Sequence, residues 1–118
     1  VIKFIRPTVR TIGSGWVASA GALIFVAAKK ENRFCLPNTR FLIHQPSGGI
    51  GGTSSDMMIQ AEQVRLMRDR LNHIFADATG QPLDRIEKDT RRDFWLNTQE
   101  ALDYGLLGKV IRTVDELQ

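Results

Sequence analysis

The stretch Gly15-Trp16-Val17-Ala18-Ser19-Ala20-Gly21-Ala22 places one hydroxyl group among small residues, and the apolar run 23–28 follows it directly. This pattern predicts that Ser19 lies at a tight junction between a strand and a buried helix. The first N–H groups of a helix have no partner within the helix. Ser19 could therefore offer a nucleophile beside an oxyanion donor. Packing or N-capping of the helix is the competing interpretation.

Outward from this tract, the apolar pattern and the length of 118 residues indicate one domain over 1–118, built from short elements. Strands are expected over 9–12, 33–36, 40–44 and 109–112. Helices are expected over 19–30, 54–78, 83–88 and 98–104. Asn97, with Glu100 three residues later, forms a capping-box pattern at the start of the last helix. Residues 1–5 are interpreted as the end of a further helix or strand.

The expected helix over 54–78 is the longest element. Charged residues cover much of its surface, and apolar residues recur at a spacing of three and four over three heptads, at Met57, Val64, Met67, Leu71, Ile74 and Ala78. This periodicity predicts one apolar stripe along the helix.

The composition excludes several classes of protein. Hydrophobic residues make up 42% of the chain and charged residues 25%, which is typical of a globular protein. The net charge of +3 arises from interspersed basic and acidic residues, so no nucleic-acid-binding surface is predicted. The uncharged run 11–28 is too short in its apolar part to cross a membrane. A single cysteine, Cys35, excludes an internal disulfide and fits a reducing compartment.

Two histidines are candidates for a base beside Ser19. His44 ends the expected strand 40–44 and precedes a glycine-rich loop, which leaves room for a substrate. His73 lies in the middle of the long helix and is interpreted as a solvated or packing residue. His44 is the better candidate, although a lone histidine at a strand end is more often a hydrogen-bonded polar residue.

Asp93 is the candidate carboxylate, at an expected helix-to-loop transition. It stands between the basic pair 91–92 and the aromatic pair 94–95. A carboxylate between Arg92 and an apolar wall could stay ionised while partly buried. The competing interpretation is a surface ion pair. If the three residues meet, Ser19 attacks a carbonyl, His44 moves the proton, and Asp93 holds the imidazole tautomer.

Metal and nucleotide sites are not predicted. One cysteine and two distant histidines do not provide the ligand spacing of a metal site. The glycines at 48, 49, 51 and 52 are not followed by a Lys-Ser or Lys-Thr pair and do not match the dinucleotide-binding spacing.

Taken together, these residues resemble the proteolytic subunit of the Clp protease (the ClpP family). The matching pieces occur in order along nearly the whole chain. They are 18–22 (Ala-Ser-Ala-Gly-Ala), 33–38 (Arg-Phe-Cys-Leu-Pro-Asn), 43–46 (Ile-His-Gln-Pro) with the glycines 48–49, 79–81 (Thr-Gly-Gln), 89–90 with 92–93, and 100–101 with 104–106.

The resemblance implies an α/β fold of the ClpP/crotonase type, made of repeated β-β-α turns, with a protruding strand-plus-long-helix handle over 48–80. It implies a serine endopeptidase with Ser19 as nucleophile, His44 as base and Asp93 as acid. The backbone N–H of Ala20 would be an oxyanion donor. A substrate peptide would pair as a strand with residues after His44, namely Pro46, Ser47 and Gly48.

The resemblance also implies partners and a compartment. Two stacked heptameric rings would form from copies of the chain, joined through the handles. A separate AAA+ unfoldase such as ClpX, ClpA or ClpC would use ATP and deliver unfolded polypeptide, so no cofactor is expected in this chain. The implied location is the bacterial cytoplasm or an organelle of bacterial origin.

Two departures from the family pattern stand out. The family's N-terminal part, which supplies a second oxyanion N–H, is missing, so the chain is expected to be incomplete at its N-terminus. Arg91 stands where relatives carry an acidic residue next to Arg92, and that pair takes part in the ring–ring contact. Asp56, at the start of the long helix, is the expected alternative partner for these arginines.

Two alternative functions remain open. One is a silent or weakly active ClpP-like subunit with a structural role in the ring. The other is an acyl-CoA enzyme of the related crotonase group, whose chemistry uses backbone oxyanion donors and needs no Ser-His-Asp set.

Overall fold

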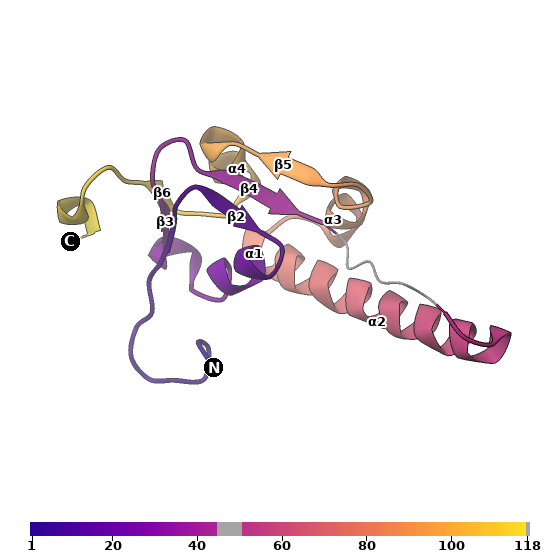
Figure 1. Cartoon of the computed structure of the whole chain (residues 1–118). Helices are drawn as coiled ribbons and strands as arrows, with labels where there is room; N and C mark the ends of the chain where they lie inside the picture. The colour runs from indigo at the N-terminus through magenta and orange to yellow at the C-terminus, as the bar shows by residue number, and fades with distance from the viewer. Residues whose placement is uncertain (45–50, 118) are drawn as a thin grey trace.

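The computed structural model describes residues 1–44 and 51–117 (Figure 1). Its elements alternate between short strands and helices. In chain order they are β1 (Thr11–Gly13), β2 (Trp16–Ala18), α1 (Ala20–Phe25), η1 (Lys30–Asn32), β3 (Arg33–Cys35), β4 (Arg40–Ile43), α2 (Ser54–Thr79), α3 (Leu83–Asp89), β5 (Phe94–Leu96), α4 (Thr98–Tyr104), β6 (Lys109–Val110) and η2 (Val114–Leu117).

The strands form two three-stranded sheets, with orders β1-β3-β6 and β2-β4-β5. Strands β1 to β4 alternate between the two sheets, so β1 and β3 pair in parallel in the first sheet while β2 and β4 pair in parallel in the second. In the second sheet, β5 runs antiparallel to β4. The chain therefore repeats a β-β-α turn twice, as expected, in β1-β2-α1 and β3-β4-α2, and each of these turns adds one strand to each sheet. The last two strands, β5 and β6, join different sheets and are separated by α4.

The core lies where these two sheets meet the helices. Its largest fully buried side chains include Phe41, Ile86, Leu106 and Leu107. Phe25 of α1 packs against Phe41 of β4 with ring centroids 5.4 Å apart. Close packing also explains one glycine: a Cβ atom on Gly13 would lie 2.9 Å from the Val17 side chain.

Arg33 is buried at the centre of this packing, with 4% of its surface exposed. Its guanidinium group donates hydrogen bonds to backbone carbonyls that follow α1, end α2 and follow α4, at Val26, Ala28, Ala78, Gly105 and Leu106. Burial lowers the pKa of Arg33, while the charge of Glu31 opposes this shift. The carbonyls at a helix C-terminus carry partial negative charge, so three helix ends solvate one cation.

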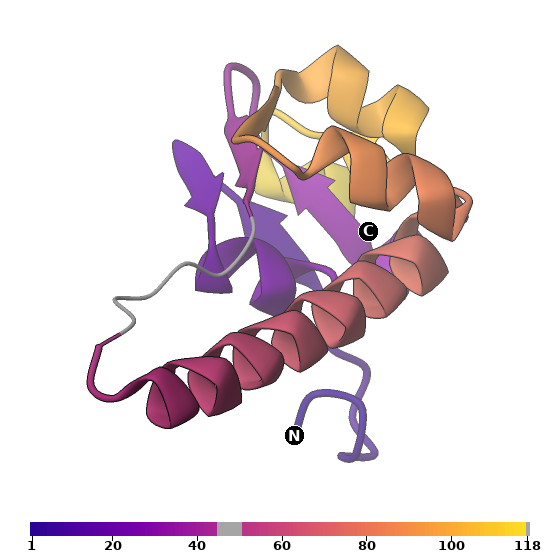
Figure 2. The same ribbon diagram turned by 90° about the vertical axis from the view of Figure 1, so that its right-hand side faces the viewer.

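Helix α2 projects from the body of the molecule (Figures 1 and 2). Its second half packs on the body and buries Asn72, Phe75 and Thr79. Its first half is exposed, and the exposed apolar side chains in that half and at the midpoint of the helix are Met57, Met58, Ile59, Leu66 and Met67. The predicted stripe is thus only partly correct: Leu71, Ile74 and Ala78 are half-buried, and the most buried residues lie beside them.

Both ends of α2 are capped. Thr53 caps its N-terminus by accepting a hydrogen bond from the Asp56 N–H, and Gly80 ends it in the left-handed conformation. Gly51 exchanges two hydrogen bonds with the Gln60 side chain, which ties the chain before the helix to its second turn.

Several expected boundaries differ from the structure. The helix expected over 19–30 is shorter, because α1 ends at Phe25 and a separate 3-10 turn, η1, follows. Residues 1–5 form turns rather than the end of a helix or strand. Strands β2 and β5 had no predicted range. Among the described residues, no helix is long and apolar enough to span a bilayer.

Candidate active site

Ser19 occupies the junction between β2 and α1, as its small neighbours predict. Its backbone angles are φ 54° and ψ −120°, a conformation that residues other than glycine rarely adopt. Such strain costs about 1–3 kcal/mol and persists where the surroundings impose it. The Ser19 side chain is exposed and makes no capping hydrogen bond to the helix. Neither helix capping nor packing in the core therefore explains why a serine occupies this position.

His44 reaches Ser19 from the neighbouring strand. Strands β2 and β4 run in parallel, so the residues that follow their C-terminal ends lie close together. The Ser19 N–H donates to the Leu42 carbonyl at 3.3 Å, and the Ser19 Oγ lies 2.5 Å from the His44 Nε2. The structure thus joins two residues that are 25 positions apart in the sequence. His73 lies on exposed α2, with its Nδ1 2.7 Å from the carbonyl of Asp69, one turn earlier.

Asp93 directly precedes β5, so the expected helix-to-loop transition is in fact a turn into a strand. The β4–β5 register pairs Ile43 with Phe94. His44 directly follows Ile43 and Asp93 directly precedes Phe94, so both residues lie next to the last pair of the register, with β5 on the side of β4 away from β2. The Asp93 side chain is exposed, so of the two interpretations left open it fits the surface position rather than the partly buried one.

The turn before Asp93 is anchored to the body by buried polar groups. Thr90, at the end of α3, donates to the Ile86 carbonyl at 2.7 Å and contacts the Asn72 side chain of α2 at 3.3 Å. Tyr104 of α4 donates its hydroxyl to Asp89 at 2.9 Å. Burial, followed by the hydrogen bond to Asp89, raises the pKa of Tyr104 far above its ordinary value, so this hydroxyl remains a donor. These contacts fix where β5 begins.

Of the other predicted site residues, some lie among the described residues and some do not. Ala20 is the first residue of α1, so its N–H points out of the helix end beside Ser19 and has no intrahelical acceptor. Pro46, Ser47 and Gly48 lie outside the described residues, as does the start of the expected handle, 48–50.

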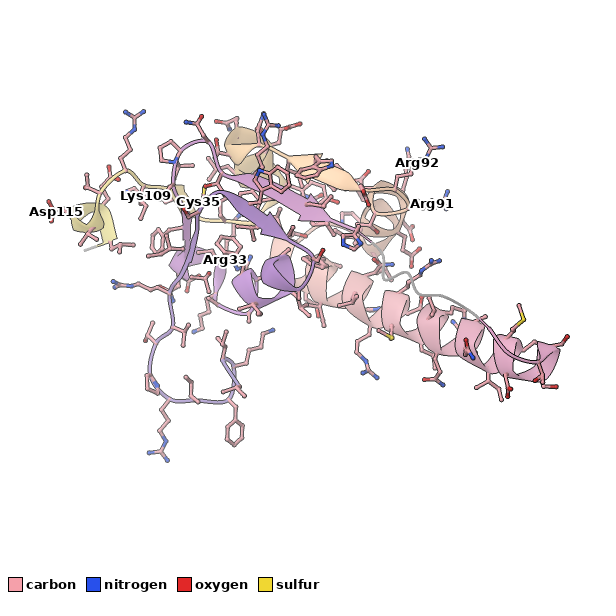
Figure 3. The ribbon with its side chains drawn as sticks, viewed as in Figure 1. Arg33, Cys35, Arg91, Arg92, Lys109 and Asp115 are labelled. Carbon is pink, nitrogen blue, oxygen red and sulfur yellow. The ribbon has the colours of Figure 1, made fainter. Side chains whose placement is uncertain are left out.

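Asp56 and Arg92, expected at a ring–ring contact, are both exposed. Figure 3 shows Arg91 and Arg92 extending outward from the turn between α3 and β5. Asp56 lies in the first turn of α2. Within residues 1–44 and 51–117, no ion pair joins Asp56 to either arginine. Nor do three or more possible metal ligands gather anywhere in this part of the chain.

Sequence reasoning missed an aromatic contact beside the site. Trp16 of β2 and Trp95 of β5 meet edge to face, with ring centroids 5.4 Å apart. Strand β4 lies between their strands in the sheet. The contact depends on the sheet order, which no local pattern encodes.

A comparison with protein-family models matches residues 1–114 to the Clp protease family. The chain belongs to this family. Over all of its 118 residues it is 88% identical to an ATP-dependent Clp protease proteolytic subunit of Paracoccus denitrificans, of which it covers 59%. It is 58% identical, over 98% of its length, to proteolytic subunit 2 of Pseudomonas aeruginosa, of which it also covers 58%.

Among solved structures, a mutant ClpP1 from Listeria monocytogenes matches with a TM-score of 0.91 and 52% sequence identity. The match covers 99% of this chain and 64% of the Listeria chain. The expected α/β ClpP fold is therefore confirmed. The Clp protease chain described here spans about 60% of the length of these curated relatives.

Proposed function

We propose that this chain carries the catalytic residues of a serine endopeptidase subunit that cleaves unfolded polypeptide through an acyl-enzyme. The contact of 2.5 Å between the Ser19 Oγ and the His44 Nε2, at a strained junction, supports this proposal most directly. A hydroxyl held against an imidazole is the nucleophile–base pair that acyl transfer needs.

Each step then has a named group. His44 accepts the proton of the Ser19 hydroxyl as the Oγ attacks the carbonyl carbon of the peptide. The Ala20 N–H donates to the oxyanion that forms. His44 then gives its proton to the leaving amine, the C–N bond breaks, and water hydrolyses the acyl-enzyme by the same route. Asp93, next to the last β4–β5 register pair as His44 is, accepts from the imidazole and stabilises its charged form.

The proposed assembly is two stacked heptameric rings, with the projecting half of α2 as the joining element. Exposed apolar side chains on a projecting helix support this, because monomeric proteins rarely expose such patches without a partner. Asp56 and the arginines 91 and 92 would meet partners on another copy. A separate AAA+ unfoldase would use ATP and feed polypeptide into the chamber, where the substrate pairs as a strand along Pro46, Ser47 and Gly48.

The test uses the full-length protein in its assembled state and a fluorophosphonate probe, which labels activated serines. We expect labelling of the natural protein, loss of labelling in Ser19→Ala, and a fall of at least about a thousandfold in peptide hydrolysis for Ser19→Ala and His44→Ala. Ser14→Ala changes another exposed serine nearby and is the matched control, expected to keep labelling.

Other results would contradict the proposal. No labelling of an assembled, full-length protein would favour a structural ring subunit. An acyl-CoA activity that survives Ser19→Ala would favour the crotonase-type alternative, which needs no serine nucleophile.

A further inference from the structure

The second sheet, β2-β4-β5, has one buried face and one open face. Side chains alternate between the faces of a strand. Val17, Phe41, Ile43 and Leu96 point to the core and are at least 92% buried. Their neighbours point the other way, and two of them are large: Trp16 is 73% exposed and Trp95 is 42% exposed.

The two tryptophans form one continuous surface on the open face. Their rings contact edge to face across β4. Leu42 is the register partner of Trp95, lies on the same face and is half-buried. We call Trp16, Leu42 and Trp95 the aromatic shelf.

The aromatic shelf adjoins the candidate active site on the same face. His44 follows Leu42 by two residues, and Asp93 precedes Trp95 by two residues. Residues two apart along a strand share a face and lie about 6.6 Å apart. The shelf is therefore within reach of a side chain next to the scissile bond of a polypeptide bound at Ser19.

We propose that the aromatic shelf determines specificity by receiving a large apolar or aromatic side chain of the substrate near the scissile bond. The proposal rests on the proposed function, because it presumes cleavage at Ser19. Tryptophan rings offer large, rigid apolar surfaces, and edge-to-face contacts add to their attraction for an aromatic side chain. A second copy of the chain lying flat on this face would also cover His44 and Asp93, so the continuity of shelf and site favours the substrate as occupant.

The test compares kcat/KM of the full-length, assembled protein for two unfolded peptides that differ in one residue beside the cleaved bond, phenylalanine or serine. We expect the preference for phenylalanine to fall about tenfold in Trp16→Ala and in Trp95→Ala, because one buried apolar group is worth roughly that factor. The change should be in kcat/KM for the phenylalanine peptide, with the serine peptide little affected. Trp16→Phe and Trp95→Phe should restore most of the preference.

Two controls distinguish a role of the shelf in specificity from a loss of catalysis at Ser19. Val114→Ala removes another exposed apolar side chain, in η2, and should leave the preference unchanged. Fluorophosphonate labelling of Ser19 should keep its rate in both tryptophan variants, whereas failure of the proposed function would abolish labelling in the natural protein. An unchanged preference overturns the proposal. Loss of the assembled particle in sedimentation, with both peptides slowed equally, also overturns it and assigns the shelf to a contact between copies.

Discussion

The two halves of helix α2 have the same secondary structure but different sources of stability. The half that reaches Thr79 buries Phe75 and Asn72 against the body. The half that starts at Ser54 has no buried residue. Its exposed surface carries Arg65 between Glu62 and Asp69, which form ion pairs along the helix. The hydrogen bond from Arg65, more than its charge, lowers the pKa of Glu62.

This contrast indicates that the half of α2 that reaches Thr79 stabilises the fold, whereas the half that starts at Ser54 is available for contacts with another molecule. Tertiary packing supplies most of the stability of helices in proteins, and an unpacked stretch depends on its own local contacts. The body half is therefore expected to respond to substitution through global unfolding. The projecting half is expected to respond through local opening and assembly.

The largest difference should come from removing one apolar side chain on each half. Phe75→Ala leaves a cavity in the core and should lower the free energy of unfolding by about 3–5 kcal/mol. Met58→Ala removes an exposed side chain and should change it by less than about 0.5 kcal/mol. Chemical denaturation followed by tryptophan fluorescence measures both. Equal losses would contradict the division of the helix.

The next largest effect concerns the arginines of the two regions. Arg33→Met removes the donor to five carbonyls, one of which ends α2, and should cost about 3 kcal/mol. Arg68→Met, an exposed change on the projecting half, should cost less than about 0.5 kcal/mol. Thermal unfolding of the two variants gives the comparison, and a stable Arg33→Met protein would show that the carbonyls find other donors.

The smallest effect concerns helix caps. Thr53→Ala removes the N-cap of projecting α2, and Asn97→Ala removes half of the capping box of α4 in the body. Each cap is worth about 1 kcal/mol. For Asn97→Ala we expect this loss in global stability. For Thr53→Ala we expect faster amide exchange confined to the first turn of α2 and unchanged global unfolding. Global destabilisation by Thr53→Ala would show that the two halves unfold together.

Local signals in the sequence predicted the elements whose boundaries are set locally. The range 98–104 matches α4 at both ends because Asn97 and Glu100 cap one end and Gly105 takes the left-handed conformation at the other. Helix α2 was predicted to within one residue for similar reasons. Strands β2 and β5 were not predicted because their residues, Trp-Val-Ala at 16–18 and Phe-Trp-Leu at 94–96, are all apolar and show no alternation. They exist because β4 lies between them and pairs with both.

The candidate site was predictable only in part. The small residues around Ser19 indicated a strand-to-helix junction, and the structure has one there. Its contact with His44 follows from the parallel pairing of β2 and β4, which the local sequence does not contain. The approach of Asp93 to the end of β4 depends on the β4–β5 register, so its assignment came from the family resemblance. Its exposure and the Trp16–Trp95 contact are visible only in the folded chain.

The buried guanidinium group of Arg33 also constrains the order in which the protein can fold during synthesis. Its acceptors lie from 7 residues before it to 73 residues after it, at Leu106. A ribosome makes Arg33 long before it makes the end of α4, and a buried cation without its acceptors is costly. The nascent chain should therefore keep this side chain in water until residue 106 has emerged. Completion of the core then becomes a late event, and chains that stop before Gly105 should remain unfolded.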